Sequence, residues 1–254
     1  MIVCKSPAEI ERMRAANALV AHVLAELAAM VAPGVTTRDL DVAAERMVRD
    51  AGAEPAFKGY RGYPATLCAS VNEQVVHGIP SARRLVEGDI LSLDIGVKLN
   101  GFYGDSAVTL PVGRISDEAQ RLLTVTEAAL ERGIGQVRVG GRVSDIGHAI
   151  QAHVEGAGFS VVREFVGHGI GAALHEEPQI ANYGEPGRGP RLAEGMTLAI
   201  EPMVNMGREA VKVLSDGWTA VTRDGSLSAH FEHTVAVTKD GPLVLTARTA
   251  ALKG

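Results

Sequence analysis

The sequence predicts an α+β fold in which two similar halves, about residues 1–112 and 113–254, make one domain. An Asn100-Gly101 pair lies between alternating β-forming runs over residues 91–110, which is the strongest short-range signal for an antiparallel hairpin. Both halves also read as two helices followed by strands, which suggests a duplicated unit. A chain of 254 residues with 46% hydrophobic content can bury a substantial core.

In the first half, a capping box at residues 6–9 with proline at the first helical position predicts a helix that ends at Pro33-Gly34. The apolar positions between them recur at helical spacing. A second helix is expected over residues 37–51. Strand-forming sequence then covers residues 65–71, and residues 75–80 lead into the hairpin.

In the second half, we expect helices over residues 116–132 and 145–157. A β-prone run ends at a histidine among three glycines over residues 165–171. An apolar strand that carries Glu201 follows over residues 196–202, where Pro202 suggests a strand end or edge, and alternation predicts another strand over residues 227–238.

The two-residue hairpin loop fixes the register of the hairpin. Gly96 then faces Asp105 and Asp94 faces Ala107, so the two aspartates are diagonal neighbours on one face, with Cβ atoms roughly 7 Å apart or less. Carboxylates that repel each other among apolar residues need solvent, a shared proton or a cation. A solvated face, an acid protease and a divalent metal site are the three alternatives.

Three further residues carry chemistry within β-forming sequence: His168, Glu201 and Glu232. The glycines around His168 have the wrong spacing for a phosphate-binding loop, and no helix follows them. Any one of these residues alone is typical of a structural or solvated position. Together with Asp94 and Asp105 they supply enough negative charge for two divalent ions, and such ligands suit Mn²⁺, Fe²⁺ or Co²⁺, with Zn²⁺ as a further option.

Composition excludes other classes of function. A net charge of −5 argues against a nucleic-acid-binding surface. Two cysteines, Cys4 and Cys68, form no disulfide framework, which fits a reducing cytosol. The sequence shows neither a signal peptide nor an apolar run long enough for a membrane span. We therefore expect a soluble, cytoplasmic protein.

Around these residues the chain resembles the type I methionine aminopeptidases over nearly its full length. Each matching motif is weak alone, but their order is highly specific. The resemblance implies the pseudo-two-fold "pita-bread" fold. The motifs are Gly-Tyr60-Arg-Gly-Tyr63-Pro, Asn72-Glu-Gln-Val-Val-His77-Gly-Ile-Pro, Ser-Leu-Asp94-Ile-Gly, Gly-Asp105-Ser, Gly-His168-Gly-Ile-Gly, Leu-His175-Glu-Glu-Pro, Ile-Glu201-Pro-Met, Gly-Trp218-Thr and Phe-Glu232-His-Thr.

The resemblance implies removal of the N-terminal methionine from nascent proteins and peptides with a small second residue. Asp105 and Glu232 would bridge two ions, Asp94 would bind one of them, and His168 and Glu201 would bind the other. A water held between two cations becomes a good nucleophile near neutral pH. Glu201 would act as its general base during attack on the scissile carbonyl.

The resemblance also places His77 and His175 beside the scissile amide, where an imidazole N–H stabilises charge on the carbonyl oxygen. Leu174 stands where an aromatic residue is expected, and Phe57 replaces a smaller residue, so the width of the methionine pocket stays open. Cys68 fits an ordinary core position equally well. The implied pocket comprises Phe57, Tyr60, Tyr63, Cys68, Leu174 and Trp218. The remaining histidines are interpreted as structural or solvated: His22, His148, His153, His230 and His233.

The family's monovalent-cation loop maps to Asn72, Gln74 and Ser228, so a monovalent cation is a further expectation. The expected partners are nascent polypeptide N-termini and the ribosome near its exit tunnel, and we expect a monomer.

The main alternative is a prolidase or aminopeptidase P of the same fold. Such enzymes tend to carry Glu-Pro-Gly and Glu-Asp, where this chain has Glu201-Pro202-Met203 and Glu232-His233. A creatinase-like hydrolase or a non-catalytic peptide- or ribosome-binding relative would have lost metal ligands. A type II enzyme needs an insertion for which the segment between residues 168 and 201 is too short.

Overall fold

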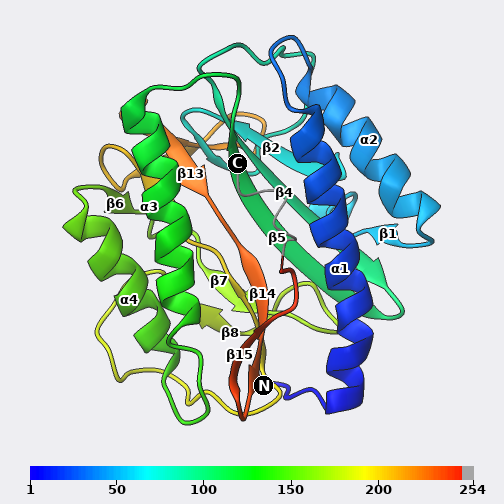
Figure 1. The fold of residues 1–254 in the computed structure, drawn as a ribbon, viewed down its shortest axis with the longest axis vertical. Coiled ribbons are helices and arrows are strands. Elements are labelled where there is room, and N and C mark those ends of the chain that lie inside the picture. The colour runs from blue at the N-terminus through cyan, green and yellow to red at the C-terminus, as the bar shows by residue number, and fades with distance from the viewer. Residues whose placement is uncertain (248–254) are drawn as a thin grey trace.

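The computed structural model describes residues 1–247. Antiparallel strands occupy the middle of the molecule, with two helices on each side (Figure 1). The helices are α1 (Pro7–Met30) and α2 (Thr37–Asp50) on one side, and α3 (Asp117–Ile134) and α4 (Val143–Gly156) on the other. This arrangement confirms the predicted α+β class.

Helix ends follow the capping signals of the sequence. The Ser6 side chain accepts a hydrogen bond from the Glu9 N–H, and the Glu9 carboxylate accepts one from the Ser6 N–H. Thr36 and Asp39 form the same capping box before α2. Each box satisfies N–H groups that have no partner within the helix, which explains why both helices begin where predicted.

The strands are short except for one hairpin, and within residues 1–247 they pair in antiparallel fashion. The longest sheet has the order β15-β14-β9-β7-β8, and β4 pairs with β1, β2 and β5 in another. The strands and one 3₁₀ turn are β1 (Glu54–Pro55), η1 (Tyr60–Gly62), β2 (Leu67–Val71), β3 (Gln74–Val76), β4 (Ile90–Leu99), β5 (Phe102–Pro111), β6 (Ser160–Val161), β7 (Gly167–Gly169), β8 (Glu176–Ile180), β9 (Thr197–Ile200), β10 (Met203–Asn205), β11 (Val211–Val213), β12 (Ala220–Thr222), β13 (Ser228–His230), β14 (His233–Thr238) and β15 (Gly241–Val244).

The β4–β5 hairpin has the predicted register. Asp94 pairs with Ala107 and Gly96 with Asp105. The two loop residues have φ angles of 53° at Asn100 and 81° at Gly101, which is the left-handed pair that a two-residue hairpin loop requires. Asp94 and Asp105 therefore lie on the same face of the hairpin.

The prediction of one strand over residues 227–238 is wrong. The strand is interrupted at Phe231-Glu232. Before the interruption β13 pairs with β10, and after it β14 pairs with β9 and β15. Two hydrogen bonds with the neighbouring strand β5 stabilise this interruption. The Glu232 N–H donates to the Ala107 carbonyl at 3.0 Å, and the Ser106 hydroxyl donates to the Glu232 carbonyl at 2.6 Å. Alternation along a sequence cannot reveal that a strand changes sheets.

Helix α1 packs closely on the hairpin because Gly104 lacks a side chain. A Cβ atom at Gly104 would lie 2.9 Å from the Asn17 nitrogen and 3.0 Å from the Ala16 carbonyl carbon. Backbone meets backbone here, and the contact lies next to Asp105. The main hydrophobic core contains buried residues from both predicted halves, including Leu24, Leu93 and Ile146.

None of the helices within residues 1–247 is long and apolar enough to cross a membrane. The order of two helices followed by strands occurs twice along the chain. The division into two similar halves stays a prediction, and its last residues, 248–254, lie outside the described chain.

Candidate metal centre and active-site pocket

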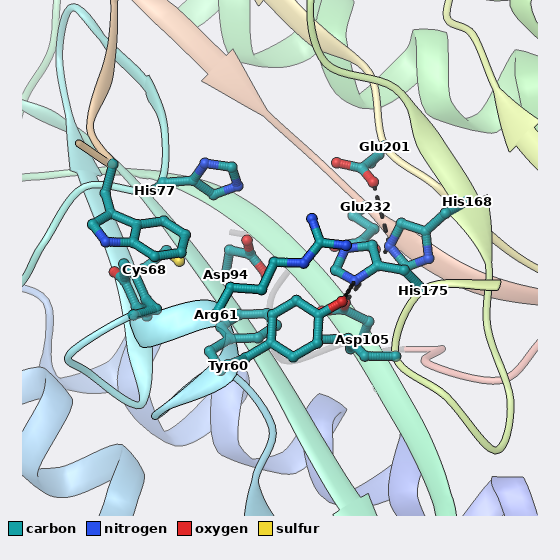
Figure 2. A pocket seen from close by; sticks show the side chains of 14 residues that line it. Tyr60, Arg61, Cys68, His77, Asp94, Asp105, His168, His175, Glu201 and Glu232 are labelled. Carbon is teal, nitrogen blue, oxygen red and sulfur yellow. Dashed lines mark hydrogen bonds and ion pairs between the residues drawn. The ribbon is translucent and has the colours of Figure 1, made fainter. Parts of the chain in front are cut away.

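A cavity of about 170 Å³ lies above the β4–β5 hairpin (Figure 2). The structure brings every predicted catalytic, metal-binding and substrate-binding residue to its walls. Arg61 also lines it and was not predicted. The lining residues are Phe57, Tyr60, Arg61, Tyr63, Cys68, His77, Asp94, Asp105, His168, Leu174, His175, Glu201, Trp218 and Glu232.

The five predicted metal ligands converge from separate segments of the chain. Ligand atoms of Asp105, His168 and Glu232 all lie within 4.8 Å of one another. His168 Nε2 lies 3.6 Å from Glu201 Oε1 and 4.0 Å from Asp105 Oδ2. Asp94 lies beside Asp105 on the hairpin. Ligands from different strands are thus held around one point.

Hydrogen bonds outside the cluster fix the His168 ring and hold the main chain that carries Asp105 and Glu201. His168 Nδ1 lies 2.8 Å from the Gly169 carbonyl, so the proton belongs on Nδ1 and the lone pair of Nε2 faces the carboxylates. The Thr234 hydroxyl donates to the Asp105 carbonyl at 2.8 Å. The Asn182 amide donates to the Glu201 carbonyl at 3.0 Å.

Burial dominates the electrostatics of the cluster. It raises the pKa of Asp94 and Glu201 well above the ordinary values, and repulsion between the carboxylates adds to the effect. It raises the pKa of Asp105 to about 7. Burial also lowers the pKa of His168 to about 4, so this imidazole is neutral at pH 7. The carboxylates thus need protons or cations as partners.

The residues present fit divalent cations. One oxygen each of Asp94 and Asp105 is buried without a hydrogen-bond partner among residues 1–247. Such atoms carry a desolvation penalty unless a cation or a proton meets them. A neutral imidazole with its lone pair turned inward completes a mixed N/O donor set that first-row divalent ions accept.

His77 and His175 lie on opposite sides of the cavity (Figure 2). His77 has a φ of 61°, an uncommon conformation for a residue other than glycine, and packs edge-on against Phe165 at 5.4 Å between ring centroids. His175 Nδ1 lies 2.9 Å from the Tyr60 hydroxyl. Burial lowers the pKa of His77 to about 4 and also lowers that of His175, with Arg61 adding to the second effect. Both rings are therefore neutral N–H donors at pH 7.

Apolar and aromatic groups form one end of the cavity. The Tyr63 and Trp218 rings meet edge to face at 5.1 Å, and the Tyr63 hydroxyl reaches the Leu67 and Gly78 carbonyls at 3.1 Å. Burial raises the pKa of the Cys68 thiol well above its ordinary value, so Cys68 contributes a neutral, weakly polar wall.

Phe57 and Leu174 belong to a small cluster on the hairpin side of the cavity. A Cβ at Gly96 would lie 2.6 Å from Phe57 Cε1, so the phenyl ring rests directly on the β4 backbone. Gly96 thus provides the space that the larger residue at position 57 requires. Leu174 is buried at 2% exposure, with its side chain on the cavity wall.

Sequence reasoning missed two residues at the site. His230 was interpreted as structural or solvated, yet it is buried with Nε2 at 3.5 Å from Glu201 Oε2. Its position two residues before Glu232 was the signal that could have found it. Arg61, at φ 50°, holds its guanidinium 5.3 Å from the Tyr60 ring and has no ion pair within the described chain. Nothing in its local sequence pointed to the cavity.

The residues of the expected monovalent-cation loop lie near one another. The Ser228 N–H donates to the Asn72 carbonyl at 2.9 Å, and the Gln74 side chain accepts from the Val71 N–H at 2.9 Å. The monovalent cation stays a prediction.

Comparison with known proteins identifies the family. The model of metallopeptidase family M24 matches residues 11–239. Methionine aminopeptidase 1 of Bacillus subtilis is 55% identical over 246 residues, which cover 97% of this chain and 99% of the relative. A methionine aminopeptidase structure from Rickettsia prowazekii superposes with a TM-score of 0.96 at 43% identity, covering 97% of this chain and 100% of that one.

A prolidase structure from Pyrococcus horikoshii superposes with a TM-score of 0.79 at 21% identity, and it covers 98% of this chain and 65% of that chain. At 21% identity the prolidase structure is evidence for the fold alone, and it confirms the predicted pita-bread architecture. The much higher identity to the methionine aminopeptidases decides between the two branches. The chain belongs to metallopeptidase family M24 and, within that family, to the methionine aminopeptidases.

Proposed function

We propose that this protein removes the N-terminal methionine from nascent proteins and peptides whose second residue is small, with two divalent metal ions at the carboxylate cluster. The observation that carries the proposal is a set of four carboxylates and one neutral imidazole at the base of a cavity with an apolar end; Asp105, Glu232 and His168 are buried, and the other two carboxylates are half-buried. Family membership supports the reaction class, which is metal-dependent removal of an N-terminal residue.

The ions would be held by the five residues of the cluster: Asp94, Asp105, His168, Glu201 and Glu232. The ions are Mn²⁺, Fe²⁺, Co²⁺ or Zn²⁺, because a carboxylate-rich site with one imidazole accepts each of them. When bound, they would lower the pKa of water and polarise the scissile carbonyl.

Glu201 is the proposed general base. Its carboxylate lies at the edge of the cluster, between His168 on one side and His230 on the other. Burial raises the pKa of Glu201 in the metal-free protein, and bound ions would lower it again, so the assignment rests on the position of this carboxylate. Glu201 would take the proton of the attacking water and then deliver it to the leaving amine.

His77 and His175 would hold the scissile peptide from opposite sides. A neutral imidazole N–H at each position can donate to the substrate amide and stabilise charge that develops on the carbonyl oxygen. The Tyr60 hydroxyl bonds to His175 Nδ1 and so helps to set the orientation of that ring. Asp94 is the proposed partner of the free α-amino group, so N-acetylated peptides should be inert.

Specificity would come from both ends of the cavity. The side chain of methionine, which is unbranched and polarisable, would enter the space between Tyr63, Cys68 and Trp218. The second residue would lie between His77 and His175. A long second side chain must displace packed groups there, at a cost of roughly 1–3 kcal/mol.

We place the protein in the cytoplasm as a monomer that meets nascent chains near the ribosomal exit tunnel. The bacterial relatives named methionine aminopeptidase support nascent N-termini as the substrate.

The test uses metal-reconstituted protein with three peptides: Met-Ala-Ser, Met-Lys-Ser and Ala-Pro. We expect kcat/KM for Met-Ala-Ser to exceed that for Met-Lys-Ser by about 5- to 150-fold, the range that corresponds to the packing cost above. Comparable values for the two methionyl peptides would contradict the proposed second-residue pocket. Preferential hydrolysis of Ala-Pro would instead assign a prolidase.

A further inference from the structure

Lys5 is a buried cation outside the cavity. Its side chain is only 4% exposed, and its ammonium lies 2.6 Å from Glu176 Oε2 and 3.2 Å from the Val3 carbonyl. The Lys5 N–H also donates to the Gly195 carbonyl at 2.7 Å, which attaches the N-terminal segment to the chain just before β9. A lysine this deeply buried requires a charged partner, and Glu176 is the one it has.

Glu176 follows directly after His175 and closes the loop of residues 171–175 that connects β7 to β8. Its second oxygen, Oε1, accepts the Ala173 N–H at 3.1 Å, while the Gly171 N–H donates to the Ala173 carbonyl at 3.1 Å. One carboxylate therefore binds the loop backbone with one oxygen and the Lys5 ammonium with the other. The loop it closes carries Leu174 and His175.

The fit between Lys5 and this loop is close. A Cβ at Gly171 would collide with Lys5 Cε and would lie 2.7 Å from Glu176 Oε1. The Gly171 carbonyl accepts the Tyr103 N–H at 2.8 Å, so the start of the loop is also fixed to β5. One packed unit therefore lies behind the side chains that face the cavity. It consists of the Lys5 stem, the Gly171 backbone and the Glu176 carboxylate.

We infer that Lys5 is a positioning residue: its buried ion pair with Glu176 holds the 171–175 loop so that His175 meets the Tyr60 hydroxyl and Leu174 closes the cavity wall. This inference rests on the proposed function for its kinetic consequence only. Lys5 touches none of the reacting groups. Its effect should therefore appear in the orientation of His175, which acts in the transition state, rather than in metal binding.

The experiment compares Lys5→Met, which keeps an unbranched stem but removes the charge, with Glu176→Gln, which keeps the acceptor for the Ala173 N–H. We expect each variant to lower kcat for Met-Ala-Ser by about 10- to 100-fold, since small misplacements of a catalytic group have effects of this size. KM should stay within about twofold, and metal content should equal that of the wild type. The double variant should be no slower than the slower single variant, because the two residues act as one unit.

The matched control is Glu11→Gln, which breaks an exposed ion pair with Arg14 on α1 and should leave kcat unchanged.

Amide hydrogen exchange of residues 171–175 provides a readout that needs no activity. We expect faster exchange at Ala173 in Lys5→Met than in the wild type. Wild-type kcat and exchange in both variants, loss of metal, or additive losses in the double variant would each overturn the inference. If Lys5→Met does not fold, the kcat and the amide exchange of Glu176→Gln test the inference instead. If the wild type fails to cleave Met-Ala-Ser, the proposed function fails, while the exchange measurement still tests the ion pair.

Discussion

Carboxylates that face one another in a buried cavity depend on the charge that they bind. Asp94 and Glu232 come from different segments, and each borders the cavity without carrying the packing of the core. We expect Asp94→Asn and Glu232→Gln to lose metal and activity together while the fold survives, because one missing charge unbalances the cluster. Elemental analysis and circular dichroism check this. Full metal occupancy with full activity in either variant would contradict the proposed two-ion site.

A second residue-scale prediction concerns His175, which contacts Tyr60 and the ring of His168 but is not a proposed ligand. We expect His175→Ala to lower kcat by about 10²-fold or more, as for other lost donors to a developing oxyanion. Metal content should not change. Loss of metal in His175→Ala would assign this histidine to the ligand set instead.

At the scale of elements, the contact between α1 and β5 depends on Gly104. Its missing side chain lets the α1 backbone approach the strand next to Asp105. We expect Gly104→Ala to lower the free energy of unfolding by roughly 1–3 kcal/mol, the usual effect of overpacking. Urea unfolding measures it. The matched control is Gly156→Ala in α4, where a Cβ meets nothing within 4 Å and helix propensity favours alanine by up to about 1 kcal/mol. Equal stability of Gly104→Ala and the wild type would show that α1 can shift without cost.

The elements that local chemistry determines were predictable from the sequence. Asn100-Gly101 fixed a two-residue loop, and with it the diagonal placement of Asp94 and Asp105. The break at Glu232 was not predictable, because it depends on which sheets the two sides of the strand join. Pairing between strands far apart in the chain leaves no periodic trace in the sequence.

The same distinction applies to the site. The site residues could be named because the chain resembles a known family at short motifs, and all residues predicted as catalytic, metal-binding or substrate-binding line the cavity. Tertiary contacts alone bring three further residues to the cavity or to the loop behind it, namely Lys5, Arg61 and His230. Their roles depend on which distant segment each one meets, which the sequence alone does not show.

At the scale of the whole molecule, the buried ionisable groups couple stability to pH. Burial raises the pKa of Asp94, Asp105 and Glu201 in the folded, metal-free protein, with Asp105 at about 7. In the unfolded chain these groups titrate near pH 4. From about pH 4 up to their folded pKa values, the folded state therefore binds more protons than the unfolded state, and stability falls as pH rises.

The buried histidines have the opposite effect. Burial lowers the pKa of His77 and His168 to about 4 and that of His230 to about 3. Below the ordinary histidine pKa of about 6.5, the unfolded chain binds more protons at these positions, so their contribution to stability is lost as pH falls. The two effects oppose each other up to about pH 7.5, one unit above the ordinary histidine pKa. From about pH 7.5 the histidines are neutral in both states, and the carboxylates set the slope.

We therefore expect the free energy of unfolding of the metal-free protein to fall as the pH rises from about 7.5 to about 8.5. Urea unfolding in the presence of a chelator, at three pH values across this range, measures the slope. Asp94→Asn should flatten it, because that variant removes one carboxyl group whose pKa is raised. With Mn²⁺ present the slope should reverse, since metal binding displaces the same protons and strengthens as the pH rises. A metal-free protein whose stability is constant or increases over this range would show that the cluster carboxylates are already ionised at about pH 7.5, and the raised carboxylate pKa values would be wrong.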